Sequence, residues 1–327
     1  MAKYTKSNNT PVGAHAGTPR QLAMTQRRLA GVPQRLAGAL TLNVKSAPYY
    51  FLLPLTLVFA AFIVYPILNS FVLSFQELES GIFKFVGIGN YVTLVKDPVF
   101  LAALKNTAVY FVIQVPVMVA LSLALAVLLD QKFLRGRAFL RMGIFLPSVT
   151  ALVAYTLVFK LILNYDYGIL NFVLSLFKIK PVNWLNTPNG ARASVIMAMT
   201  WRWTGYNMVI MLAGLQAIPH ELRESASLDG AGPWNQFRRI TVPMMRPIIL
   251  FVTITSTIGT FQLFDESYVL TRGGPNNATV TIVHHLYNNG FRYFKFGYAA
   301  AISYVLVIII GALSLIQMKA GGDGANG

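Results

Sequence analysis

Apolar stretches long enough to cross a lipid bilayer recur along this chain of 327 residues. A hydrocarbon core about 30 Å thick is crossed by roughly 20 apolar residues of helix. The first stretch, residues 46–76, contains no charged residue. It is longer than the apolar core of a secretory signal peptide and lacks a small-residue cleavage site, so we expect it to be retained. The chain is therefore predicted to be an integral membrane protein.

Five further apolar stretches follow, without a block of soluble-domain size between them. They are residues 106–129, 142–163, 194–216, 247–264 and 297–318. Charged residues make up only 12% of the chain, whereas a soluble domain carries roughly 25%. These observations predict an all-α membrane protein with six transmembrane helices over residues 46–318. A basic tail (residues 1–45) precedes this domain and a short tail (residues 319–327) follows it.

The basic residues predict the orientation of these helices, because Lys and Arg are retained on the cytoplasmic side. The two tails and the second and fourth links hold 16 of them, against 7 in the other three links. Both termini are therefore expected to be cytoplasmic. The net charge of +16 then reflects contact with anionic lipid headgroups, and no nucleic-acid partner is expected.

The N-terminal tail, residues 1–45, contains no acidic residue. Nothing in it would build a core, although residues 21–42 could form a basic helix on the membrane surface. An Arg-bearing, acid-free N-terminus is also typical of organellar transit peptides. We expect a plain cytoplasmic tail, with the transit peptide as the alternative.

The residues that enzymatic chemistry needs are scarce. The chain has no cysteine, 4 histidines and 11 acidic residues, and it contains neither a Walker A loop nor an H-E-x-x-H pattern. The adjacent His284 and His285 would point about 100° apart on a helix, which does not suit one metal ion. Asp265 and Glu266 are expected at the rim of a span. We therefore predict no catalytic residue, no metal site and no enzyme.

The link over residues 217–246 has the pattern of two helices joined by a sharp turn. Pro219 suits the first turn of a helix that continues to Asp229, and Gly230 can adopt the left-handed conformation that stops it. A second short helix would start at Pro233 and end at Pro243 and Pro247, with one face formed by Trp234, Phe237 and Thr241. Such an elbow could dock in a groove of another protein. It could equally be a solvated link on the membrane surface.

The sequence of this elbow, ESASLDGAGPWNQFRRITVP, resembles the cytoplasmic coupling motif of permease subunits of binding-protein-dependent ABC importers. Ser225 and Val242 replace the alanine and leucine that are usual there. The stretches FVGIGNYVTLVKDPVFLAALKNT, LAGLQAIP, FDESYVLTRGGPNNAT and FGYAAAIS are similar to the carbohydrate branch of this family, which includes the maltose and glycerol-phosphate permeases. The resemblance covers residues 48–318.

The resemblance implies the type I importer fold in a bacterial or archaeal cytoplasmic membrane. It also implies four kinds of partner: a second, homologous permease, two cytoplasmic ATPase subunits, an external solute-binding protein, and a carbohydrate as solute. ATP would be bound by the ATPases, so this chain would hold no cofactor. The residues implied in coupling to the ATPases are Glu224, Ala226, Asp229, Gly230 and Pro243.

The segment TWRWTGYN in the fourth predicted span is the leading candidate for the solute path. Charged and amide groups inside a span are costly unless they face a partner or a water-filled cavity. Aromatic rings can stack on sugars, and amides can bind their hydroxyl groups. These two criteria select four candidate residues for the solute path, Arg202, Trp203, Tyr206 and Asn207. An interfacial aromatic belt with a snorkelling arginine is the alternative.

The resemblance to the maltose permease adds three residues of the fifth span to the path, Ser256, Thr260 and Gln262. They replace the asparagines of that relative, so maltose itself is not implied, and Arg202 would also suit an acidic sugar or a sugar phosphate. Gly205, Gly214 and Gly259 could allow helices to approach closely.

Transport of a sugar, an oligosaccharide or a sugar derivative is thus the main prediction. A permease for another solute class is the first alternative, followed by a stand-alone carrier or channel. A proton-coupled carrier should bury an acidic residue in a span. None occurs in residues 46–76, 106–129 or 142–163.

Overall fold

A computed structural model describes residues 47–131 and 134–322. The chain divides after Pro66 into two units. The described part of the first unit consists of α3 (Ala47–Phe59), the π-helical turn η1 (Ala60–Val64) and the start of α4 (Tyr65–Leu73). The predicted tail over residues 1–45 lies outside the described residues.

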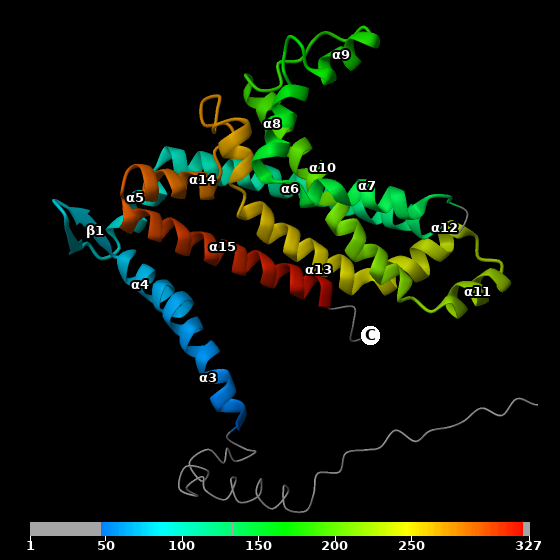
Figure 1. The fold of residues 1–327 in the computed structure, drawn as a ribbon, viewed down its shortest axis with the longest axis horizontal. Coiled ribbons are helices and arrows are strands. Elements are labelled where there is room, and N and C mark those ends of the chain that lie inside the picture. Colours follow the sequence, from blue (N-terminus) through cyan, green and yellow to red (C-terminus); the bar gives the residue numbers. More distant parts are fainter. Residues whose placement is uncertain (1–46, 132–133, 323–327) are drawn as a thin grey trace, which may run out of the picture. The chain divides into compact units, whose positions relative to one another are not determined.

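The second unit consists mostly of helices (Figure 1). One antiparallel hairpin joins β1 to β2, with Gln76 opposite Phe85. The elements are β1 (Gln76–Glu79), β2 (Ile82–Phe85), α5 (Gly89–Lys96), α6 (Pro98–Asp130), α7 (Arg137–Val149), α8 (Leu152–Ile162), α9 (Ile169–Leu176), α10 (Pro188–Gln216), α11 (His220–Leu228), α12 (Pro233–Gln236), η2 (Phe237–Thr241), α13 (Val242–Phe261), η3 (Glu266–Leu270), α14 (Ile282–Tyr287), η4 (Asn288–Arg292) and α15 (Phe296–Gly322).

Two of the long helices begin several residues before the predicted spans, because capping residues extend them. The carboxylate of Asp97 accepts hydrogen bonds from the N–H groups of Val99 and Phe100, so α6 starts at the next residue, Pro98. The hydroxyl of Thr187 does the same at the start of α10. In both helices a proline follows the cap, where its missing N–H costs nothing.

The prediction of a helical protein with several membrane-spanning helices is confirmed. Within the described residues, four helices are long and apolar enough to cross a membrane: Ala47–Leu73, Pro98–Asp130, Pro233–Phe261 and Phe296–Gly321. Helices α7 and α8 together form a fifth candidate, bent by 102° at their junction. Helix α10 has 29 residues but is less apolar. Six crossings therefore remain a prediction that depends on α10 and the bent pair.

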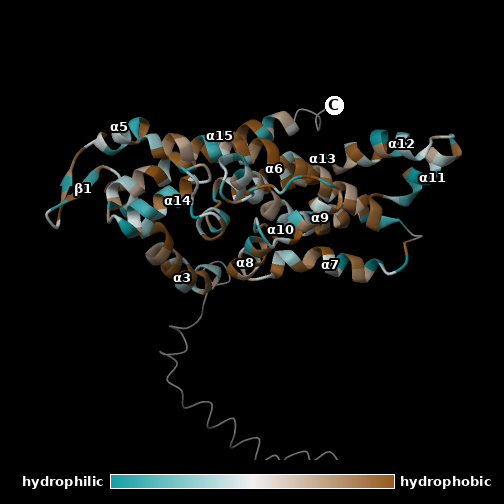
Figure 2. Ribbon diagram, turned by 90° about the horizontal axis from the view of Figure 1, so that it is seen from above, coloured by the Kyte–Doolittle hydropathy of each residue, from teal (hydrophilic) through white to brown (hydrophobic). Residues whose placement is uncertain are grey.

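The interior of the second unit lies where α6, α10 and α13 pack together, with α15 against α13. Figure 1 shows α13 and α15 running side by side, and Figure 2 shows hydrophobic residues along α6, α13 and α15. One core cluster contains Met208 and Met211 of α10 with Met245 of α13. Large apolar side chains of α7 and α8 remain exposed, which fits lipid or a partner.

Two of the three glycines considered for close approach do pack tightly. A Cβ atom at Gly205 would collide with the backbone carbonyl of Ile144 in α7, and one at Gly214 would collide with Ile248 of α13. Gly259 has nothing within 4 Å of its Cβ position, so the expectation was wrong there. Gly259 instead lines a cavity described below.

The elbow is only partly as predicted. Helix α11 is capped by Pro219 and Asp229, as expected, and Gly230 is left-handed with φ of +78°. The second helix, however, does not end at Pro243: it continues through η2 and α13 to Phe261. A proline removes one N–H from the helical ladder, and here the π-helical turn directly before Pro243 already shifts that ladder. The predicted end of the second helix was therefore wrong.

Candidate functional site

A cavity of about 140 Å³ lies between α6, α10 and α13. Its lining combines amides, hydroxyls, aromatic rings and methionines and contains no charged side chain. The lining residues are Gln114, Met118, Met199, Trp203, Tyr206, Asn207, Thr255, Ser256, Gly259 and Thr260. An uncharged polar and aromatic surface of this kind can bind the hydroxyl groups and the ring faces of a sugar.

Hydrogen bonds across the helices hold the polar side chains of this cavity in place. The amide of Asn207 in α10 donates to the hydroxyl of Ser256 in α13 at 3.2 Å. The hydroxyl of Thr260 lies 3.1 Å from the amide oxygen of Gln114 in α6. Because Asn207, Gln114 and Thr260 are buried, leaving one of them unpaired would cost about 1–3 kcal/mol. The cavity is therefore a fixed arrangement of three helices.

Five of the seven residues predicted for the solute path line this cavity. Trp203, Tyr206 and Asn207 come from one predicted span, and Ser256 and Thr260 from the next. Gln262 is exposed at the end of α13, and Arg202 is buried on another side of α10. The structure thus brings together five uncharged residues of the predicted set and leaves Gln262 and Arg202 outside the cavity lining.

Sequence analysis missed the contribution of α6, which consists of Gln114 and Met118. Gln114 lies inside the predicted span over residues 106–129 and is only 1% exposed. An amide in an apolar span is itself an indication of a cavity or a partner. The same reasoning selected Asn207 in α10, and in α6 it would have selected Gln114 as a cavity residue. Nothing in the sequence singled out the two methionines.

The Arg202 side chain is 6% exposed, so it does not extend toward solvent. Its guanidinium carbon lies 4.5 Å from the ring centroid of Tyr155 and 5.3 Å from that of Trp203. The Tyr155 hydroxyl in turn donates a hydrogen bond to Glu266. Glu266 follows the end of α13 and is 2% exposed, so its side chain lies inside the protein. Arg202, Tyr155 and Glu266 thus form a buried network that links α10, α8 and η3.

Four of the predicted coupling residues lie on α11 or in the turn that joins it to α12, and Pro243 lies at the start of α13. Glu224, Asp229, Gly230 and Pro243 are exposed, and Ala226 is half-buried. The N–H of Ala231 donates to the carbonyl of Ala226 at 2.9 Å across the turn. A Cβ atom at Gly230 would meet nothing, so only its positive φ requires glycine. Two apolar side chains also project from the elbow: Leu228 is 89% exposed and Trp234 is 69% exposed.

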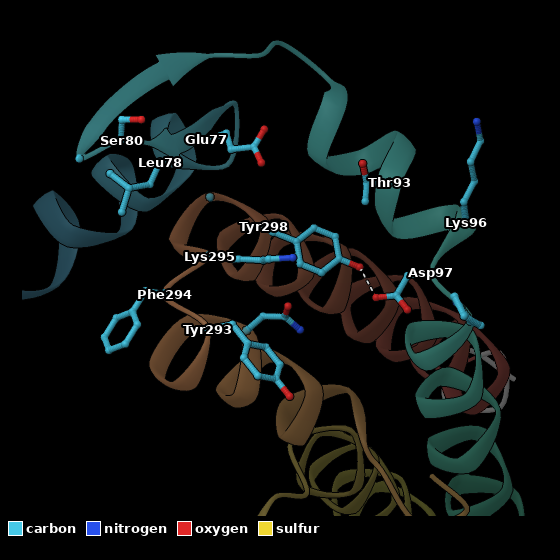
Figure 3. Close-up of a pocket in the computed structure, with 14 residues that line it drawn as sticks. Glu77, Leu78, Ser80, Thr93, Lys96, Asp97, Tyr293, Phe294, Lys295 and Tyr298 are labelled. Carbon is cyan, nitrogen blue, oxygen red and sulfur yellow. Dashed lines mark hydrogen bonds between the residues drawn. The ribbon is translucent and has the colours of Figure 1, made fainter. Parts of the chain in front are cut away.

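A second cavity, of about 780 Å³, lies at the end of the second unit away from α11 (Figures 1 and 3). The β1–β2 hairpin, α5 and the start of α15 surround it. Tyr298 donates its hydroxyl to Asp97 at 2.6 Å, as Figure 3 shows, and the His285 ring lies 2.9 Å from the same carboxylate. Asp97 therefore joins the starts of α6 and α15 to α14.

Titratable groups at this end have shifted pKa values. Burial opposes ionisation of Asp97, but hydrogen bonds from Tyr298 and the backbone keep the pKa of its carboxyl below the ordinary value. Burial lowers the pKa of His284 to about 4, so its ring is neutral at pH 7. The rings of His284 and His285 diverge, the first toward Ser267 and the second toward Asp97. Within residues 47–131 and 134–322, no three potential metal ligands come together.

Comparison with known protein families decides what kind of protein this is. Residues 117–318 match the family described as binding-protein-dependent transport system inner membrane component. The chain belongs to this family. The matched region contains the cavity-lining parts of α10 and α13 and the whole elbow. This protein is therefore a multi-pass inner-membrane component of an ABC transporter, as the elbow sequence predicted.

Curated relatives of this permease resemble it over nearly their whole length. The lactose transport system permease protein LacF of Rhizobium radiobacter is 45% identical over 83% of this chain and 93% of its own. The arabinooligosaccharides transport system permease protein AraP of Bacillus subtilis is 38% identical over 85% of this chain and 90% of its own.

A solved structure has the same fold. It belongs to a bacterial ABC transporter involved in the import of the acidic polysaccharide alginate. The match has a TM-score of 0.75 with 22% sequence identity, over 85% of this permease and 95% of that chain. The predicted type of fold, that of ABC importer permeases, is thereby supported.

Proposed function

We propose that this permease is the membrane-spanning subunit of an ATP-driven importer that carries a neutral sugar or short oligosaccharide into the cytoplasm. The observation that carries the proposal is the extent of the match to sugar permeases. The lactose permease protein is 45% identical over 276 residues, and the match includes both the cavity and the elbow. Family membership gives the transport role, and the cavity supports the type of solute.

The cavity lining supports a neutral solute. All ten lining residues are uncharged, and the Trp203 and Tyr206 rings are partly exposed, so they are available for stacking on a sugar. Arg202, the residue that suited an acidic sugar, is buried against Tyr155 and Trp203 instead. An acidic sugar or a sugar phosphate therefore loses its main support.

A second, homologous permease would complete the solute site. The cavity of about 140 Å³ is small, because sites for drug-sized ligands have roughly 300–1,000 Å³. One chain thus supplies part of the site. The exposed apolar faces of α7 and α8 leave room for such a partner and for lipid. Six crossings result if α10 spans the membrane and the bent α7–α8 pair counts as one span.

The elbow is the proposed contact with one of two cytoplasmic ATPase subunits, which would bind and hydrolyse ATP in place of this chain. Its support is the exposure of Glu224, Leu228 and Trp234, which the packing of this chain does not explain. With the elbow in the cytoplasm, both termini are cytoplasmic too. The cavity near Asp97 then faces the outside, where a solute-binding protein would deliver the sugar.

Transport would proceed by alternating access. Closure of the ATPases around nucleotide displaces the elbow, and α12 continues directly into α13, which lines the solute cavity. A displacement of the elbow is thus passed to the cavity along one continuous helix. Coupling requires only that the inward-facing and outward-facing states bind nucleotide differently.

A competition assay in whole cells tests the proposed function. Cells that express this permease with the partner permease, the ATPase and the binding protein of its own transporter would take up radiolabelled lactose, with unlabelled sugars as competitors. We expect neutral disaccharides or oligosaccharides to compete and acidic ones to have little effect. Competition by oligogalacturonate alone would contradict the neutral solute. Uptake that persists without the ATPase would contradict the importer.

A further inference from the structure

We infer that Arg223 is a positioning residue whose ion pair with Asp130 connects the elbow to α6. This inference rests on the proposed function, because it gives the pair a role in coupling. A guanidinium nitrogen (Nη1) of Arg223 lies 3.0 Å from Oδ2 of Asp130, the last residue of α6. The second terminal nitrogen (Nη2) lies 3.5 Å from the carbonyl of Leu215 in α10.

Helix α11 has few other means of attachment to the spans. None of its residues is buried. In the part of the chain that the structure describes, Arg223 is the one α11 side chain that forms a hydrogen bond or ion pair with α6 or α10. The bond between Gln236 and Ser227, at 2.9 Å, stays within the elbow. Arg223 therefore determines how α11 lies against the membrane spans.

The position of Asp130 supports a specific role for this pair. A carboxylate at the C-terminal end of a helix is unfavourable, because that end carries partial negative charge, and a cation there is favourable. Asp130 contributes the wrong charge to its own helix, and Arg223 compensates for it. The two side chains are 19% and 26% exposed, so the pair is less screened than one on the open surface.

The three helices that line the solute cavity are connected to the elbow in three different ways. Helix α12 continues as α13, and the short segment after Gln216 joins α10 to α11. Helix α6 has no such chain connection to the elbow, and its polar link is Arg223 to Asp130. Because Gln114 and Met118 of α6 line the cavity, this pair would make the third wall move with the other two.

Without the pair, α11 could rotate about its two ends. On one side lies the turn at Gly230, held by the hydrogen bond from Ala231 to Ala226 within the elbow, and on the other Ala217 to Pro219 form a short turn. A push from the ATPase would then move α11 without moving α6. The expected defect is in coupling: nucleotide is still hydrolysed, but less sugar enters for each ATP.

A charge-swap experiment tests this inference in the assembled transporter in proteoliposomes. The variants are Arg223→Glu, Asp130→Arg and both together, with uptake measured for the sugar selected by the competition assay. We expect each single variant to retain the ATPase and to lose about three- to tenfold in sugar imported per ATP hydrolysed. The double variant should recover most of that ratio, because the pair is restored with opposite orientation.

Arg135→Glu is the matched control, since Arg135 is an exposed basic residue just after α6 that forms no ion pair among the described residues. It should keep the wild-type ratio. If a reversal prevents assembly, Arg223→Gln and Asp130→Asn remove the charge more gently, with the same expected defect. A single variant with the wild-type ratio, or a well-assembled double variant no better than the singles, would overturn the inference.

Failure of the proposed function would look different. A wild-type chain that takes up no sugar, or that retains no ATPase, contradicts the importer itself. The geometry can then still be tested, because the chain has no native cysteine. Arg223→Cys with Asp130→Cys should be joined by a short bifunctional thiol reagent in membranes. Absence of that cross-link would refute the pair independently of transport.

Discussion

The cavity between α6, α10 and α13 and the elbow formed by α11 and α12 are built in opposite ways. The cavity is enclosed by buried polar side chains that bond from helix to helix, such as Thr260 to Gln114. Helix α11 buries none of its residues and projects Leu228 almost fully into solvent. The cavity is explained by packing within this chain. The elbow has residues that only a partner explains.

This contrast implies different consequences of mutation in the two regions. Substitutions around the cavity should affect folding or solute affinity, because those side chains touch one another. Substitutions on the elbow should leave the chain folded and affect its partners.

Gly205→Val should have the largest effect, because its side chain would collide with the backbone of α7 at Ile144. Overpacking typically costs about 1–3 kcal/mol, and a backbone carbonyl cannot move aside as a side chain can. We expect little folded protein in the membrane, measured by fluorescence-detected size-exclusion chromatography. Gly259→Val is the control, since the space beside Gly259 is open. Equal yields of the two variants would contradict the packing of α7 against α10.

The elbow variant Glu224→Lys with Gly230→Val should fold and yet lose coupling. A β-branched residue is unfavourable at the left-handed turn by about 1 kcal/mol or more. The charge reversal would oppose a basic residue expected in the ATPase groove. We expect loss of copurifying ATPase, or hydrolysis that no longer drives uptake. Full retention of the ATPase together with normal uptake would show that the elbow is a solvated link.

The buried network of Arg202, Tyr155 and Glu266 should behave as a unit. Arg202→Met removes the cation that lies over the Tyr155 ring, and Glu266→Gln replaces the carboxylate that accepts the Tyr155 hydrogen bond. Because both changes act on the same Tyr155 side chain, their effects should not be additive. We expect each single variant to lower the thermal stability of the purified protein, and the double variant to recover much of the loss. Additive losses would show that the two charges do not interact.

Asn207→Leu should have the smallest effect, because it keeps the size of the side chain but removes its bond to Ser256. The cavity should lose affinity for the sugar, seen as an increased KM for uptake, while ATP hydrolysis without solute is unchanged. Gln262→Leu is the matched control, since Gln262 lies outside the cavity lining and is exposed. An unchanged KM for Asn207→Leu would remove Asn207 from the solute path.

Much of this organisation could be predicted from the sequence, because the periodicity and length of apolar stretches are local properties. Four predicted spans correspond to long apolar helices, and Gly230 occupies the expected turn. The family was recognisable from the elbow sequence. Where a helix starts also depends on its capping residue. Asp97 caps α6, so this helix starts at Pro98, before the predicted span over residues 106–129.

Other features depended on contacts between distant segments and could not be read locally. The sequence placed Arg202 among the solute residues because a charged group inside a span should face a partner or a water-filled cavity. A shift of one residue on a helix turns the side chain by about 100°, however, and Tyr155 determines where the guanidinium lies. The hydrogen bond between Glu266 and Tyr155 could not be predicted either, because the two residues are 111 positions apart in the sequence.

The most direct test of the whole account is ATP-dependent sugar uptake by proteoliposomes containing this permease, its partner permease and the two ATPases. The solute-binding protein and radiolabelled sugar are supplied at the face opposite to the elbow. We predict uptake only when ATP is present on the elbow side, and its loss in the Glu224→Lys, Gly230→Val variant. Equal uptake without ATP or without the ATPases would show that the chain is a stand-alone carrier and would contradict the account.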